Sequence, residues 1–249
     1  MSKSFLSMAT IMGISGCLSA LSTTQTFAAD QRLAEFDYVR LQASFSAVAN
    51  PDVEEDSSPT GGSNTNYEWD GLRDTGYQMA ITALFGRGIS SESAWQWGAE
   101  FVYGSYDITP QGFTTTGTGG GATKNGSTAK LYHKTYGVNV VGGWQYGMIN
   151  VDEFTGFVEI MPHIGAGFAT ADNEVNTGTS YIKESGSGAY WEAGLRVSAY
   201  ITEKRFIYGI TINYQYGRST VDVDFPGYTS EMEMERHGLG IGAVAGYRF

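Results

Sequence analysis

The chain has 249 residues, of which 16% are charged and 14% are aromatic, and it contains 34 glycines. Few charges beside many aromatics and glycines are unusual for a soluble helical protein, but they suit a wall that faces lipid and long polar loops. The formal net charge of −11 argues against nucleic acid as a partner, because an acidic surface leaves the phosphates without counter-charges.

Residues 1–28 have the pattern of an export signal. Lys3 provides a positive start, a diluted apolar segment follows, and Ala28 ends a small-residue cleavage site. We therefore predict a signal peptide over residues 1–28 and one mature domain over residues 29–249.

The single cysteine, Cys17, lies inside this signal, so the predicted mature domain has no cysteine and forms no disulfide. The segment Ile14-Ser15-Gly16-Cys17 also resembles the lipobox of bacterial lipoproteins. In that alternative, cleavage occurs before Cys17 and its sulfur carries a lipid. We favour the interpretation that Cys17 is an ordinary small apolar residue of the signal peptide, because such short matches to a lipobox arise by accident within apolar segments.

The mature chain contains no run of about 18 apolar residues, the length that a membrane helix needs. Runs of about ten residues recur instead, in which apolar side chains alternate with small or polar ones, as in a strand with two different faces. In a barrel embedded in lipid, the apolar set faces outward and the polar set faces the lumen. Pro162 interrupts the fifth run, since proline cannot donate to the ladder. Eight runs follow one another, near residues 36–48, 77–85, 95–104, 133–144, 158–168, 191–201, 206–216 and 238–249.

The connections between the runs alternate in length. Short ones lie near 86–94, 145–155 and 202–205, and long ones rich in Gly, Ser, Thr, Asn and Asp lie near 49–74, 107–128, 171–188 and 218–236. Short periplasmic turns and long outer loops are typical of an even-stranded barrel, and closure leaves no strand edge unpaired in lipid. We therefore predict an all-β fold, a closed antiparallel up-and-down transmembrane β-barrel of eight strands with four long extracellular loops. Aromatic residues near both ends of the runs predict two belts at the membrane interfaces.

The last run ends in Ala245-Gly246-Tyr247-Arg248-Phe249. It resembles the closing strand of small outer-membrane barrels, in which a terminal aromatic residue serves as an assembly signal for the barrel-assembly machinery. The mature chain as a whole resembles the group of the OmpA-type transmembrane barrel, OmpX and the opacity proteins. The resemblance implies a place in the bacterial outer membrane, contact with its lipid and lipopolysaccharide, and an assembly role for Tyr247 and Phe249. Because it is architectural, it implies little about activity.

Charged residues at inward positions are the first candidates for a functional site. Three acids balance three arginines, and eight strands leave room for little beyond side chains, so we predict a salt-bridge network that plugs the lumen. Strand order and depth pair Glu100 with Arg196 near mid-barrel and Glu159 with Arg40 lower down. In the alternative, inward glycines leave a narrow path for ions or small solutes. By parity the inward set is Arg40, Glu100, Glu159, Glu192, Arg196 and Arg248, with His133 and His163.

The residues offer no catalytic, cofactor or metal site. His163 with Glu159 and either Ser198 or Ser44 could form a nucleophile–base set inside the lumen. Lipid substrates, however, approach the outer wall, where no histidine is expected within the membrane. No zinc-type spacing of His and Cys is present either. We therefore predict a non-enzymatic protein without a cofactor.

The extracellular segments hold the remaining candidates. The first long connection is acidic, and we expect its carboxylates to be solvated; Lys130 and Lys134 face outward, where they could meet lipopolysaccharide. Residues 218–236 continue the alternation with charged outward positions, which predicts a hairpin that projects into water and turns at Pro226-Gly227. Such a hairpin could present its edge to a host protein.

These expectations favour a surface-exposed structural barrel that supports envelope integrity or adhesion through its loops. A narrow pore for ions or small solutes is the alternative, and an outer-membrane enzyme that cleaves lipid or peptide is a distant third.

Overall fold

The computed structural model describes residues 38–48, 51–59, 65–70, 73–89, 93–110, 112–115, 128–151, 154–176, 181–225 and 227–249. The predicted signal peptide, its cleavage site and Cys17 lie outside the described residues. In the described part of the chain, no helix is long and apolar enough to cross a membrane.

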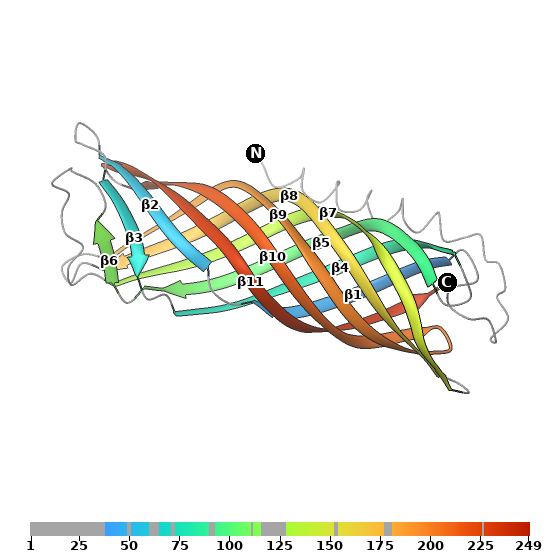
Figure 1. Ribbon diagram of the computed structural model, residues 1–249. Coiled ribbons are helices and arrows are strands. Elements are labelled where there is room, and N and C mark those ends of the chain that lie inside the picture. Colours follow the sequence, from blue (N-terminus) through green and yellow to red (C-terminus); the bar gives the residue numbers. More distant parts are fainter. Residues whose placement is uncertain are drawn as a thin grey trace.

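Eight antiparallel strands form a closed ring, because the first strand pairs with both its successor in the ring and the last strand. This confirms the predicted up-and-down order, and Figure 1 shows the strands tilted around a long barrel. The strands of the ring are β1 (Tyr38–Val48), β4 (Arg73–Gly88), β5 (Ser93–Thr109), β7 (Thr128–Val151), β8 (Phe154–Asn176), β9 (Tyr181–Glu203), β10 (Phe206–Phe225) and β11 (Tyr228–Arg248).

The pairing register determines how far the strands tilt. Following the pairing once round the ring from Tyr38, with the constant β7–β8 register carried across Gly143 and Met161, leads back to β1 at Val48, ten residues further along the strand. For eight strands this offset corresponds to a tilt of roughly 43°, within the usual range for barrels. The path passes Gly86, Gln96, Gly143, Met161, Arg196, Asn213 and Gly240.

Much of the connections predicted near 49–74, 171–188 and 218–236 is strand, so the strands extend further than the sequence indicated. β8 and β9 continue as a hairpin to Asn176 and Tyr181, and β10 and β11 continue to Phe225 and Tyr228. Three further strands extend the sheet from β11 in the order β2 (Pro51–Pro59), β3 (Thr65–Asp70) and β6 (Gly112–Thr115). Figure 1 shows them at one end of the barrel, opposite the C-terminus. We call this end, beyond the membrane, the extracellular section.

The outer wall carries a band of exposed apolar side chains, as the alternation predicts. Val140 is 69% exposed, Ile241 70% and Ile210 64%, values that are costly in water and favourable in lipid. The two predicted aromatic belts border this band. Ring pairs such as Trp95–Trp144, with centroids 5.3 Å apart, lie on the periplasmic side, and Tyr136–Phe168, at 4.8 Å, on the other.

Pro162 is part of this wall although it cannot donate to the ladder. Its side chain is exposed on the outer face, and it pairs with Leu195 of β9. On the β7 side, the pairing passes from Val141↔His163 to Trp144↔Ile160 without including Pro162. The register is the same on both sides of this interruption, so the strand continues through the proline.

The interior changes character along the barrel axis. Within the membrane band it is mainly polar, whereas the extracellular section encloses one apolar core. That core consists of Val53, Tyr106, Ile108, Ala129, Leu131, Ala169, Ala171, Val175, Tyr190, Val221, Val223, Phe225, Met232 and Met234.

Candidate functional site

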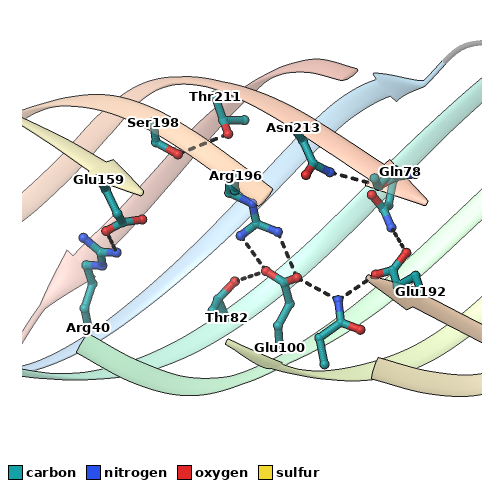
Figure 2. A network of polar contacts seen from close by, with 12 residues as sticks. Arg40, Gln78, Thr82, Glu100, Glu159, Glu192, Arg196, Ser198, Thr211 and Asn213 are labelled. Atoms are coloured by element: carbon teal, nitrogen blue, oxygen red, sulfur yellow. Dashed lines mark hydrogen bonds and ion pairs between the residues drawn. The ribbon is translucent and has the colours of Figure 1, made fainter. Parts of the chain in front are cut away.

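An ion pair between Glu100 and Arg196 occupies the middle of the lumen. Nη1 and Nη2 of Arg196 donate to the two carboxylate oxygens of Glu100 over 2.7 and 2.8 Å. The same carboxylate accepts hydrogen bonds from Thr82 at 2.6 Å and from Asn139 at 3.1 Å. Figure 2 shows Thr82 and Arg196, from β4 and β9, pointing toward Glu100 of β5; Asn139 belongs to β7. The bidentate geometry and the added donors satisfy charges that would otherwise be costly to bury.

Asn139 connects this pair to a second carboxylate. Its amide nitrogen also donates to Glu192 over 2.6 Å, and Gln78 donates to Glu192 over 3.1 Å (Figure 2). Glu192 was expected in the lumen, whereas Asn139 and Gln78 were not singled out from the sequence. An amide side chain between two carboxylates keeps both hydrogen-bonded without adding charge.

The second predicted pair, Arg40 with Glu159, lies nearer the periplasm. Arg40 donates to Glu159, which also accepts hydrogen bonds from Gln96 and, over 2.9 Å, from Tyr200. The guanidinium lies 5.2 Å from the centre of the Tyr200 ring, close enough for a cation–π contact. Both predicted pairs are therefore present, at the relative depths expected from strand order.

The third buried arginine is Arg236, not the predicted Arg248. Arg248 is only half-buried, since it lies at the periplasmic end of β11 opposite Arg40. Arg236 is 2% exposed and lies between two tyrosine rings, 4.6 Å from the centre of Tyr106 and 5.2 Å from that of Tyr190. It donates to both hydroxyls, and Glu192 lies 3.8 Å away.

Arg236 could have been found from the sequence, because it shares the inward parity of the buried Met234. It lies where the polar lumen meets the apolar extracellular core, since both tyrosines belong to that core. The guanidinium, the two rings and the apolar side chains beyond them fill the extracellular end of the lumen.

The two inward histidines do not form the nucleophile–base set considered from the sequence. His163 is buried, but Glu159 is hydrogen-bonded to Arg40 and Tyr200, and Ser198 donates to Thr211 over 3.1 Å. A different contact, Ser219 Oγ to His133 Nε2 at 2.9 Å, was missed. Both of its residues are buried beneath the apolar core, out of reach of lipid or peptide.

The outer face of the extracellular section is strongly acidic on the β10–β11–β2 side. Glu231 lies directly between Asp222 of β10 and Asp56 of β2, so three carboxylates share one row of the sheet. The next rows along β11 pair Glu233 with Glu54 and Glu235 with Asp52. Like charges directly opposite each other destabilise a sheet. We call these seven residues the acidic face.

One cation lies beside the acidic face. Arg218 donates to Glu233 and lies 3.7 Å from Glu235. Not every acid of the first connection is solvated as expected, because Glu55 is 1% exposed and accepts a hydrogen bond from Ser230 over 2.9 Å.

The β8–β9 hairpin carries an exposed ion pair on its outer face. Lys183 donates to Glu174 over 2.8 Å, and this hydrogen bond lowers the pKa of the Glu174 carboxyl and raises that of the Lys183 amine. Lys130 and Lys134 of neighbouring β7 point outward, as predicted. The side chains of described residues form no group of three or more His, Cys, Asp or Glu that could hold a metal ion.

The closed ring, the apolar band between two aromatic belts and the charged section beyond it define a small outer-membrane β-barrel. No protein-family model matches the chain, and no curated protein matches it by sequence. Solved structures of similar fold are themselves outer-membrane proteins.

Three of these structures are representative. The attachment invasion locus protein Ail of Yersinia pestis is 12% identical, with 86% of this chain and 99% of that chain covered and a TM-score of 0.31. The outer membrane protein OprG of Pseudomonas aeruginosa is 11% identical, with coverages of 90% and 99% and a TM-score of 0.38. The outer membrane protease OmpT of Escherichia coli is 7% identical, with coverages of 91% and 99% and a TM-score of 0.40. Likenesses this distant support no inference about the activity of this chain.

Proposed function

We propose that this protein is a non-enzymatic, surface-exposed barrel that acts through its extracellular section, in adhesion or in the integrity of the envelope. The observation that carries this proposal is the apolar core of the extracellular section, which fills the outer end of the lumen. A barrel that is filled in this way presents a surface, not a passage.

The shape of the extracellular section supports the same role. A loop-only barrel would present mobile segments, whereas here β2 and β3 continue the sheet from β11 and form a wide β-surface. The β10–β11 hairpin was expected to offer a free edge, but β11 is covered by β2 over Arg236–Tyr228. We therefore propose that a partner binds the side chains of the acidic face and not a strand edge.

On the opposite side of the extracellular section, β7 carries positively charged outward side chains. Lys130 and Lys134 lie above the aromatic belt, where they would meet the phosphates of lipopolysaccharide. We propose that these lysines hold the barrel against its lipid, while the acidic face is turned to a positively charged partner.

Two measurements test this function. Purified protein in a planar bilayer should give no steady current, and a steady current that changes in Arg196→Ala or Glu100→Ala would make the lumen a pore. Bacteria that express the protein should adhere to epithelial cells or to one another. A variant that neutralises the row of three carboxylates (Asp222→Asn, Glu231→Gln and Asp56→Asn), with barrel assembly verified by heat-modifiable migration, should lose this adhesion. Unchanged adhesion would overturn the proposal.

A narrow pore remains the second candidate, because several buried amide atoms in the lumen have no protein partner. An outer-membrane enzyme that cleaves lipid or peptide is the third candidate function. It has the weakest support, since His133 and His163 are buried and neither forms a Ser–His–acid set within reach of a substrate, while the exposed His237 lies 3.7 Å from Asp52.

A further inference from the structure

Two of the three histidines of the chain have carboxylates beside them. His237 is exposed on the outer face, and its Nδ1 lies 3.7 Å from a carboxylate oxygen of Asp52. His163, inside the membrane band, interacts electrostatically with Glu100 and Glu192. A proton on either ring would therefore find a counter-charge.

His133, the third histidine, is buried where the apolar extracellular core meets the lumen. It is 2% exposed and lies directly opposite Tyr106 of β5 and Ala171 of β8, both of which belong to that core. Its Nε2 is hydrogen-bonded to Ser219 Oγ of β10 over 2.9 Å, whereas its Nδ1 has no hydrogen-bond partner. In either neutral tautomer, one ring nitrogen is paired and the other is not.

The ionisable groups that face His133 offer no counter-charge. The Tyr106 ring lies 6.1 Å from the His133 ring and 4.6 Å from the Arg236 guanidinium, so a charged His133 would share this tyrosine with another cation. The other described ionisable side chains on the inner faces of the nearby strands are Tyr190, Glu192 and Glu55. Tyr190 is hydrogen-bonded to Glu192 and Arg236, and Glu55 accepts a hydrogen bond from Ser230 near the tip of β11.

This burial gives the core a pH-dependent stability. It lowers the pKa of His133 from the ordinary 6.5 to about 3, because the charged ring would lose its hydration. The closed core then binds fewer protons than an opened core, in which water reaches the ring. Its stability is therefore complete above about pH 6.5 and falls as the pH decreases toward 3, and each pH unit within that window multiplies the opening constant by roughly ten.

We propose that His133 is an acid-sensitive latch of the extracellular core. While the ring is neutral, its bond to Ser219 joins β7 to β10 inside the closed core. A protonated ring is stable only when water reaches it, so acid opens the core and uncovers the outer end of the lumen. The latch is a property of the core and does not depend on what the acidic face binds.

Hydrogen exchange of the protein in lipid bilayers, corrected for intrinsic rates, tests the latch. Between pH 7 and 4.5 the opening constant of the core-lining amides, Ala129–His133 and Ser219–Val223, should rise roughly seventyfold. It should not rise in His133→Gln, whose amide can still bond to Ser219 but takes no proton. His237→Gln is the matched control and should keep the whole rise. Protonation of the acidic face acts in the opposite direction, because it removes repulsion between the strands.

The same rise in His133→Gln, or no rise in the wild type, would overturn the proposal. Should His133→Gln fail to assemble, NMR of the wild type with labelled histidine decides, since only three rings contribute signals. At pH 4.5 the His133 ring of the closed barrel should still be neutral, while the exposed His237 ring is charged. A charged His133 ring in a core whose amides keep their protection at pH 7 would show that no latch exists.

Discussion

The membrane-embedded part of the barrel and its extracellular section have opposite polarity. In the membrane, apolar side chains such as Ile241 face outward. The interior holds Glu100 and the side chains that donate hydrogen bonds to it, among them Arg196. Above the membrane, the outward positions of the same strands carry charged side chains, such as Glu231 and Lys130, and Leu131 and Met234 are buried inside. One strand, β11, contains both arrangements without a change of parity.

The difference shows that the solvent, not the backbone, determines which residue types stand on each face. Alternation with period two is a property of the strand, and it continues from lipid into water. The transition lies at Arg236, whose charge is held between two rings of the apolar core on one side and Glu192 on the other. Each part can therefore be disrupted by a substitution that the other part would tolerate.

The largest effect is expected from breaking the central ion pair. Arg196→Ala leaves Glu100 buried without its bidentate partner, which should lower the free energy of unfolding by about 3–5 kcal/mol. The control is Arg218→Ala in the extracellular section, whose ion pair with Glu233 is solvent-exposed and should contribute about 0–1 kcal/mol. Urea titration of both variants in lipid vesicles measures the contrast, and equal losses would contradict a dry central pair.

The next comparison uses two leucines, one in the extracellular core and one on the lipid-facing wall. Leu131→Ala opens a cavity in the extracellular core and should cost about 2–5 kcal/mol. Leu239→Ala, on a lipid-facing position that is 64% exposed, should cost much less because acyl chains replace the lost contacts. Hydrogen exchange should show faster amide opening in the upper part of β10–β11 for Leu131→Ala only. Opening of the whole barrel would mean that the two parts unfold as one.

A charge introduced at an outward position should be destabilising in the membrane band and tolerated in the extracellular section. Ile241→Arg places a charge in the apolar band and should cost about 2–4 kcal/mol. Asp222→Arg has the same outward parity in the extracellular section, but there it should gain about 0.2–1 kcal/mol, because it turns the repulsion between Asp222 and Glu231 into an attraction. The same vesicle titration measures both variants. A small cost for Ile241→Arg would show that the band does not face lipid.

Parity made the membrane part predictable from the sequence. It identified the inward Glu100, Arg196, Arg40 and Glu159, and strand order was enough to pair them, because alternation and connection order are local properties. Contacts that depend on register could not be read in this way. The register does place Glu159 directly opposite Ser198, but His163 lies four residues further along β8, opposite Gly194, so the three residues do not form one set.

The extracellular section was harder to predict from the sequence than the membrane part. Its Gly-, Ser- and Thr-rich composition indicated loops, but long-range pairing with β11 makes 51–59 a strand and buries Glu55. Arg236 was missed for a related reason, since its segment was interpreted as a charged hairpin in water. Its two tyrosine partners are 130 and 46 residues away along the chain.

The smallest effect is also the one that connects stability with the proposed function. Glu231 stands between Asp222 and Asp56, so Glu231→Lys converts two like-charged neighbours into oppositely charged ones. We expect a gain of about 0.2–1 kcal/mol per pair, an intermediate gain for Glu231→Gln, and weaker gains of both at high salt. Urea titrations at low and high salt measure these differences.

If the acidic face serves only the fold, adhesion should be the same in Glu231→Lys as in the wild type, or better as stability rises. If it binds a positively charged partner, the more stable variant should adhere less, and Glu231→Gln should fall between the two. Higher stability with weaker adhesion cannot come from a damaged barrel, because damage would lower both. That opposition would explain why the sheet keeps three facing carboxylates that cost it stability.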